Sequence, residues 1–350
     1  MDNYKYTTSE EQIKKLKSQN LLFQNEEFAK IVLDTYGYYN IINGYRDPYI
    51  IREYEKKVYC PDISFEQIFS LFQFDHALRN AILLSMIDLE EHLRALVADI
   101  IAASFGSDHN TYLNNNNYRD KTVSNPRFSR NNVLAYMRQI ANQSYRQPIK
   151  YYREMHGIIP PWILMKGIDF GTLINYIKYF KSPEKTKLIT KIYGEQVNDQ
   201  NLDNFKDLLS DTLALCREYR NLAAHGGRVY NYIPNNKLRP FNDIPIPAQG
   251  LSQLLIGLEF LSFELPGQRL EIAITNSLNE HCQVYLNDIA RLEQATGLNI
   301  STEKFVWINE KTHKYHINPN CSGASNLKKV TYEYASSNGF EECHKCCNNI

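Results

Sequence analysis

The sequence predicts a mainly α-helical fold, with a helical bundle over residues 1–300 and a small β-hairpin and helix module over residues 301–350. Apolar residues recur every three or four positions along several segments, which places them on one side of a helix. The alternation typical of half-buried strands is scarce before residue 300. From Phe305 the pattern changes, and four cysteines crowd the last thirty positions. We therefore expect a large helical domain and a short C-terminal module.

Helix-capping signals mark the first elements. Thr8 and Glu11 have the spacing of a capping box, in which each side chain satisfies a backbone N–H at the start of a helix. A second short helix is expected over residues 25–36. A third begins at Ser64 and continues to about Ser104. A helix of that length is unusual in a globular protein, so we expect a kink or break inside it.

The middle of the chain alternates turns with further helices. Pro160-Pro161-Trp162 predicts a stiff turn, and a helix follows it from near Asp169. Residues 197–204 have no strand-type alternation and are expected to form a polar connector. Two more helices are expected at about residues 250–262 and 268–295. The first three hundred residues are thus expected to be all-helical.

A long amphipathic helix is expected between these segments, ending near His225. Asp203 or Asn204 can cap its start, and Gly226 can end it in a left-handed turn. Its apolar stripe consists of Phe205, Leu208, Leu209, Thr212, Cys216, Tyr219 and Ala223.

The bulk composition is that of an ordinary globular protein. The chain has 350 residues, of which 43% are hydrophobic and 22% charged, and 39 basic side chains balance 39 acidic ones. The most apolar stretch, residues 251–265, is interrupted by polar side chains, and Met1-Asp2-Asn3-Tyr4-Lys5 has no apolar signal segment. We expect a cytoplasmic protein.

Positive charge is concentrated in one stretch of the chain. Residues 119–191 contain fourteen basic side chains against four acidic ones. Cationic groups interleaved with aromatic rings suit RNA, although a solvated basic face with its tyrosines packed inward fits the pattern equally well. We expect Arg146, Lys150 and Arg153 to contact RNA. The interleaved tyrosines are Tyr136, Tyr145, Tyr151, Tyr152, Tyr176 and Tyr179.

The most informative feature is the run Arg220-Asn221-Leu222-Ala223-Ala224-His225 at the end of the long helix. An imidazole can move the 2′-hydroxyl proton of RNA, and a guanidinium can hold the phosphate, so the two suit RNA cleavage without a metal. Five residues turn an ideal helix by about 140° beyond a full turn. The two side chains can therefore converge only if the helix unwinds at its end, which Gly226-Gly227 permits.

This run resembles the Arg-x(4–6)-His motif of the HEPN superfamily, helical bundles that include many metal-independent ribonucleases. Further pieces in the same order resemble the abortive-infection (Abi) family of phage-resistance proteins, in its AbiD/AbiF-like branch. The similarity covers roughly residues 5–295. The pieces are Ser9-Glu10-Glu11-Gln12-Ile13, Gly37-Tyr38-Tyr39, Asn43-Gly44-Tyr45, Phe74-Asp75, Glu90-Glu91, Pro161-Trp162, Phe170-Gly171, the Arg220 to His225 run and Tyr230-Asn231.

The resemblance implies a HEPN-like bundle, a role in phage defence, and RNA as substrate or as a structured non-coding partner. Arg220 would hold the scissile phosphate, His225 would act as acid and base, and Asn221 would orient one of them. Arg217, one turn earlier, is a candidate phosphate contact or a plain surface arginine. A single imidazole per chain is insufficient, because cleavage uses both a base and an acid. We therefore expect a homodimer with a composite site.

The last fifty residues predict a metal module. Residues 305–317 have the pattern of a β-hairpin, and a short helix is expected around residues 331–336. His316, Cys321, Cys343 and Cys346 have the spacing of a closed tetrahedral Zn²⁺ site, and the arrangement is similar to small zinc modules appended to nucleases. The near neighbours His313, His344 and Cys347 could substitute as ligands but are expected to face solvent.

Two other functions remain compatible with these residues. The chain could be a non-catalytic RNA-binding or scaffold protein, in which Arg220 and His225 grip a structured RNA. A DNA-directed regulator acting through the zinc module is disfavoured, because no helix-turn-helix with a basic recognition helix is present in the sequence.

Overall fold

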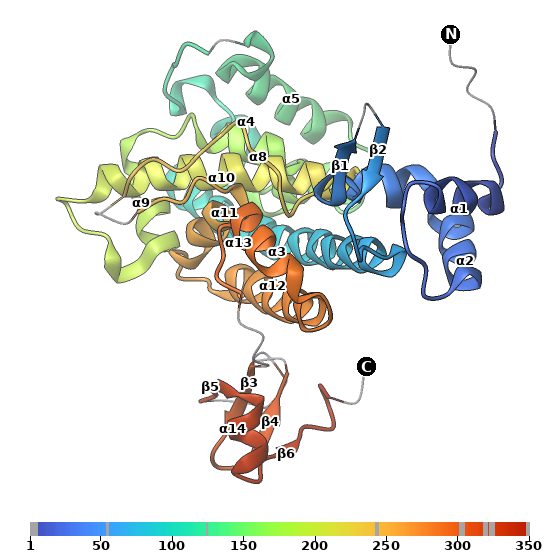
Figure 1. The fold of residues 1–350 in the computed structure, drawn as a ribbon. Helices are drawn as coiled ribbons and strands as arrows, with labels where there is room; N and C mark the ends of the chain where they lie inside the picture. The colour runs from blue at the N-terminus through green and yellow to red at the C-terminus, as the bar shows by residue number, and fades with distance from the viewer. Residues whose placement is uncertain are drawn as a thin grey trace. The chain divides into compact units, whose positions relative to one another are not determined.

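The computed structural model describes residues 6–53, 56–123, 125–241, 245–300, 305–317, 321 and 326–347 (Figure 1). The protein is mainly helical, with a small sheet near the C-terminus, as the sequence predicts. Met1 to Lys5, and residues 301–304 where we expect the C-terminal module to begin, lie outside the described residues. Within the described ranges, every helix is too short or too polar to cross a bilayer.

The chain divides into two compact units. One comprises Met1–Arg79 and Ile272–Ile350, and the other comprises Asn80–Glu271. The helices α3 (Phe65–Phe105) and α12 (Leu265–Val284) each contribute residues to both units. The helix α3 is uninterrupted from Phe65 to Phe105, so the expected break inside it is absent.

The first unit opens with helices and a hairpin. Glu11 N–H donates to Thr8 Oγ1, and Thr8 N–H donates to Glu11 Oε2 at 2.9 Å, which confirms the capping box. The all-helical expectation is wrong at residues 50–53 and 56–59, which form two antiparallel strands. These strands have only four residues each, too few for alternation to stand out in the sequence. The elements are α1 (Ser9–Lys17), α2 (Glu26–Tyr36), the π-helical turn η1 (Tyr39–Asn43), the 3₁₀ turn η2 (Asp47–Tyr49), β1 (Ile50–Glu53) and β2 (Lys56–Tyr59).

A buried polar cluster joins two pieces of the family-like sequence pattern. Tyr45 OH donates to Asp75 Oδ2 at 2.6 Å, and Arg79 Nη1 donates to the same carboxylate at 2.7 Å. All three side chains are buried. Buried charges are tolerated only when paired and hydrogen-bonded, so Tyr45 and Asp75 have a structural role in this unit.

The helix expected over residues 268–295 is interrupted. α12 ends at Val284, a 3₁₀ turn covers Leu286–Asp288 (η7), and α13 covers Ile289–Thr296. The turn places the buried Asp288 carboxylate 2.9 Å from His281 Nε2 and within 2.6 Å of Tyr49 OH. These hydrogen bonds explain the interruption, because an unbroken helix would direct Asp288 elsewhere.

The C-terminal module is a four-stranded sheet with one short helix. Its strand order is β5-β3-β4-β6, with Trp307 opposite His316 in the antiparallel β3–β4 pair. The predicted hairpin and helix are both confirmed. The elements are β3 (Phe305–Asn309), β4 (Lys314–His316), β5 (Lys328–Thr331), α14 (Tyr332–Ser337) and β6 (Glu341–Glu342), and the core is Val306, Ile308, Tyr315 and Ala335.

The second unit is built around α10 (Leu202–Ala224), which packs against α8, α9 and α11 (Figure 1). This helix starts earlier than either cap that the sequence indicates. Asn198 Oδ1 accepts from the N–H groups of Gln200 and Asn201 in a tight turn, and α10 begins directly after it. The other helices are α4 (His109–Tyr112), α5 (Arg130–Gln143), α6 (Ile149–His156), α7 (Pro161–Leu164), α8 (Phe170–Ile177), α9 (Ser182–Tyr193) and α11 (Gly250–Glu259), and the 3₁₀ turns are η3 (Asn115–Asn117), η4 (Pro126–Phe128), η5 (Met165–Gly167) and η6 (Gly194–Gln196).

Candidate catalytic site on α10 and candidate metal centre

The apolar stripe of α10 is buried as the sequence predicts. Burial raises the pKa of Cys216, in this stripe, to about 12, so its thiol is an inert core group. Outside this stripe the helix carries Arg217 and Arg220, both half-buried, and the exposed Asn221. Arg220 follows Cys216 by four positions and so borders the stripe, whereas Asn221 is turned furthest from it.

Glycine ends the helix one residue beyond His225. His225 is the C-cap, with its side chain exposed and its backbone N–H donated to Asn221 O at 3.1 Å. Gly226 has φ of +71°, the left-handed conformation that glycine adopts without strain. Gly227 lies against Leu222, where a β-carbon would come within 2.2 Å of Leu222 Cδ1. The two glycines thus stop α10 directly after the histidine.

Arg220 lies in the last turns of α10, and His225 is its C-cap. The helix stays regular through Ala224, and the backbone leaves the helical conformation at His225, with φ of −95° and ψ of 12°. Among the described residues, no hydrogen bond or ion pair links the two side chains. Arg220 Nη1 instead lies 3.5 Å from Asn221 Oδ1. The two side chains are therefore not joined directly within one chain.

Glu90 on α3 lies near the motif arginine. Burial raises the pKa of Glu90, while the positive charges of Arg94 and then Arg220 oppose that rise. Arg94 Nη2 donates to Glu90 and also to Ile168 O at 2.6 Å. The structure places Glu90 near Arg220, a proximity that no local sequence pattern indicates.

The segment after the glycines is tied back to α10 by Glu218. Its carboxylate accepts from the backbone N–H of Asn235 at 2.9 Å and of Asn236 at 3.1 Å. It also accepts from Tyr232 OH at 3.2 Å and from the amide of Asn236. Tyr230 is buried and packs in the core. These bonds keep residues 232–236 along the helix.

A cavity of about 860 Å³ lies between α5, α8 and α10, and is called here the α5–α8–α10 cavity. Arg217 and Asn221 line it from α10, so two of the predicted site residues share one hollow. The sequence alone does not indicate the other residues that line the cavity. Asn132, Tyr136 and Gln139 recur at helical spacing in the sequence, but only the fold shows what that side of α5 faces.

The other predicted RNA contacts are on or just before α6 and do not line this cavity. Arg146 is exposed. Lys150 Nζ lies 4.0 Å from Glu154. Arg153 donates to the carbonyls of Ala141 at 3.1 Å and Ser144 at 2.8 Å, which secures the end of α5. Of the six interleaved tyrosines, Tyr176 and Tyr179 are buried, whereas Tyr136, Tyr145 and Tyr151 are exposed.

His316, Cys321, Cys343 and Cys346 gather in the C-terminal module. Their ligand atoms all lie within 4.8 Å of one another. The Sγ atoms of Cys321 and Cys343 are 3.7 Å apart, and Cys346 Sγ is 3.7 Å from His316 Nδ1. One imidazole and three thiols at these separations can bind a metal ion. The four residues that the sequence singles out are therefore brought together.

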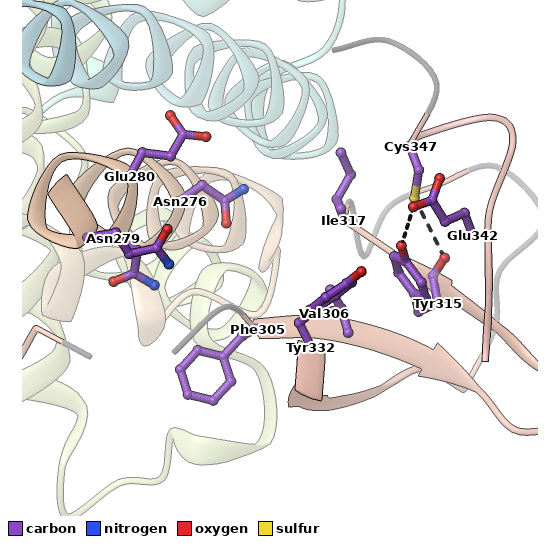
Figure 2. A pocket seen from close by; sticks show the side chains of 11 residues that line it. Asn276, Asn279, Glu280, Phe305, Val306, Tyr315, Ile317, Tyr332, Glu342 and Cys347 are labelled. Atoms are coloured by element: carbon purple, nitrogen blue, oxygen red, sulfur yellow. Dashed lines mark hydrogen bonds between the residues drawn. The ribbon is translucent and has the colours of Figure 1, made fainter. Parts of the chain in front are cut away.

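The neighbouring candidates make other contacts. Cys347 is half-buried, so the expectation that it faces solvent is wrong: its Sγ donates to Tyr315 O at 3.8 Å and lies 4.0 Å from Cys346 Sγ. Figure 2 shows Cys347 and Glu342 near Tyr315, whose OH donates to Glu342 at 2.6 Å. His313 is exposed and its ring stacks on Phe340, with centroids 4.3 Å apart. His344 is exposed. The four-ligand set needs none of these three residues.

A family described as Abi-like protein matches this chain over residues 31–231, a span that includes Arg220, Asn221 and His225. No curated protein and no solved structure matches it. The matched span ends before the four metal-site residues. Since the match covers more than half of the sequence, the chain belongs to the Abi-like protein family.

Proposed function

We propose that this chain is a HEPN-type endoribonuclease that acts in phage defence by abortive infection. Membership of the Abi-like family supports the defence role. The observation that carries the nuclease assignment is the placement of Arg220, Asn221 and His225 at the accessible end of α10, beside a cavity that Asn221 and Arg217 line. An exposed imidazole at a helix end is suited to proton transfer.

The reaction that these groups can perform is transesterification within the RNA strand. A base removes the 2′-hydroxyl proton, the 2′-oxygen attacks the adjacent phosphorus, and the 5′-oxygen leaves with a proton from an acid. The products are a 2′,3′-cyclic phosphate end and a free 5′-hydroxyl. His225 would move protons, and Arg220 would stabilise the crowded phosphate. Asn221, 3.5 Å from Arg220 Nη1, would orient the guanidinium.

A composite site in a homodimer would supply the second proton-transfer group that one chain lacks. One chain supplies a single imidazole in this motif, and the reaction needs two proton-transfer groups. A two-fold axis through the ends of two α10 helices would bring two imidazoles and two guanidiniums to one phosphate.

The alternative is a non-catalytic protein that holds a structured non-coding RNA. The negative charge of Glu90 partly offsets that of Arg220, which would lessen the stabilisation of the extra negative charge that develops on the phosphate during cleavage. Arg220 would then anchor an RNA backbone without taking part in chemistry.

We further propose that the C-terminal module binds a structural Zn²⁺ through His316, Cys321, Cys343 and Cys346. Thiolates about 2.3 Å from a tetrahedral zinc ion are roughly 3.8 Å apart. The Cys321–Cys343 separation of 3.7 Å fits that value. Three thiolates and an imidazole complete the coordination, so the ion would hold the module together rather than activate water.

Incubation of RNA with the wild type and His225→Ala in EDTA tests the main proposal. The wild type should produce 2′,3′-cyclic phosphate ends, and the variant should bind RNA without cutting it. Zinc content measured after the incubation controls for loss of the structural metal. Equal cutting by both proteins would remove His225 from the mechanism, and no cutting by either would favour the RNA-holding alternative.

A further inference from the structure

The α5–α8–α10 cavity has the size of a nucleotide site. Its volume of about 860 Å³ falls within the range of pockets that bind small molecules. Its walls all belong to the unit Asn80–Glu271, and Asn221 of the motif is one of them. A group bound in this cavity would therefore lie next to the proposed site of cleavage.

Two exposed aromatic rings border the cavity. Phe128 is 38% exposed and Tyr136 is 45% exposed, and both line it. Aromatic rings that remain accessible in a polar hollow can stack on a nucleobase, whatever its identity. The guanidinium of Arg127 lies 5.9 Å from the centre of the Phe128 ring, which adds positive charge at the same border.

Side-chain amides supply groups that match base edges. Asn132, Gln139 and Asn175 all line the cavity. Asn175 is only 4% exposed, and its Oδ1 accepts from Lys178 Nζ at 3.1 Å. Its amide nitrogen has no partner among the residues that the structure describes. An acceptor on a base would satisfy this nearly buried donor.

The cavity lining carries charges of both signs. Asp169 accepts from Thr172 N–H at 2.9 Å and from Thr172 Oγ1 at 2.7 Å at the start of α8. Glu218 accepts from residues 232–236. Within the described ranges, Arg127 and Arg217 have no carboxylate partner, so their guanidinium groups can bind a phosphate.

A cluster of cations continues from the cavity through Lys178, which contacts its wall residue Asn175. Burial lowers the pKa of Lys178, and the nearby charges of Arg217 and Lys121 lower it further. Burial lowers the pKa of Lys185 to about 8, with contributions from Arg119, Lys121, Lys178 and Lys206. The repulsion between these positive charges lowers the stability of the fold. A bound phosphate backbone would offset this repulsion.

We infer that the α5–α8–α10 cavity binds one unpaired nucleotide of an RNA strand, with its base against Tyr136 and Phe128 and its neighbouring phosphates toward Arg217 and Lys178. The substrate class of the proposed nuclease is then single-stranded RNA, so this inference rests on the proposed function. A base within a duplex is stacked and paired and cannot enter such a cavity unless it is flipped out.

Fluorescence of a short RNA carrying one 2-aminopurine tests the inference without cleavage. The protein is the full chain with His225→Ala, which keeps the strand intact. Stacking on an aromatic ring quenches 2-aminopurine, so the single strand should bind with quenching, and the same strand annealed to its complement should not. Adding Tyr136→Ala should weaken binding about tenfold and remove the quenching. Tyr136→Phe should retain both.

Tyr6→Ala is the matched control, because Tyr6 is exposed and does not line the cavity. This variant should bind and quench like its parent. Quenching and affinity that are unchanged in Tyr136→Ala would overturn the inference. An equal response to the duplex would also overturn it.

The outcome is separable from that of the nuclease proposal. Quenching that depends on Tyr136, together with a wild type that cuts no RNA, would support the nucleotide site and refute the nuclease. Cleavage by the wild type that Tyr136→Ala leaves unchanged, with no quenching in any variant, would support the nuclease and refute the nucleotide site.

Discussion

Glu90 and Arg220 come from α3 and α10 and share one electrostatic environment at the candidate site. Burial raises the pKa of the Glu90 carboxyl, and Arg94 and then Arg220 oppose that rise with their positive charges. The carboxylate in turn reduces the positive potential that Arg220 presents to a phosphate. The strength of RNA binding should therefore depend on the charge of Glu90.

Glu90→Gln should tighten RNA binding by about two- to fivefold, the range expected for one partly exposed opposing charge. Glutamine keeps an oxygen that can accept from Arg94, so the local packing is preserved. Glu91→Gln is the control, because it removes the same charge from the exposed neighbouring residue. Fluorescence anisotropy measures the RNA affinity of both variants. Weaker binding by Glu90→Gln would show that Arg220 does not face phosphate.

The helix end should be sensitive to the residue at Gly226. Gly226→Ala should cost about 1 kcal/mol of unfolding free energy, because φ of +71° is strained for alanine. No atom lies within 4 Å of the added β-carbon, so the cost comes from the backbone alone. Gly226→Asn should cost less, since asparagine tolerates this conformation. Urea unfolding provides the values, and equal stabilities would refute the left-handed cap.

The Lys185 cation should make RNA binding depend on pH near 8. Its folded pKa of about 8 lies below the ordinary value of 10.5, because of burial and the neighbouring Arg119, Lys121, Lys178 and Lys206. Affinity should fall as pH rises from 7 to 9, and Lys185→Met should lose this step. Lys187→Met removes an exposed charge and should retain the step. An unchanged pH profile in Lys185→Met would contradict the prediction.

The same shift has a consequence for stability. Below pH 8 the folded chain bears the full cost of the buried charge. Between pH 8 and 10.5 the folded state releases the proton and the unfolded chain keeps it, so the contribution of Lys185 to stability rises with pH. Lys185→Met should therefore melt above the wild type at pH 7, by about 2 °C or more, and the difference should shrink toward pH 10.

Metal removal should unfold the C-terminal module. Structural zinc contributes roughly 10–16 kcal/mol in small modules, far more than the few buried side chains Val306, Ile308, Tyr315 and Ala335 can supply. Native mass spectrometry should find zinc in the wild type and none in Cys343→Ser. Cys347→Ser should keep the metal, because Cys347 contacts Tyr315 O. Loss of zinc from Cys347→Ser with retention in Cys343→Ser would contradict the ligand set.

Local patterns in the sequence account for much of the fold. The stripe from Phe205 to Ala223, the Thr8–Glu11 capping box and the hairpin from Phe305 each depend on neighbours in the sequence. The β1–β2 hairpin and the interruption after Val284 were not predictable in this way. The second depends on Asp288 meeting Tyr49, a partner 239 positions away.

The same distinction between local and long-range contacts applies to the candidate site. Arg220, Asn221 and His225 are found from their spacing, and the four metal ligands from theirs. The proximity of Glu90 to Arg220 and the cavity between Tyr136 and Arg217 arise only when helices far apart in the sequence pack together. The basic stretch over residues 119–191 was also ambiguous, because its tyrosines divide between core and surface.

A purified heterodimer with one wild-type subunit and one His225→Ala subunit tests the composite site most directly. If one phosphate needs both imidazoles, this heterodimer should cut RNA no faster than the His225→Ala homodimer. Two independent sites would instead leave it with half the wild-type rate, and that result would contradict the shared site.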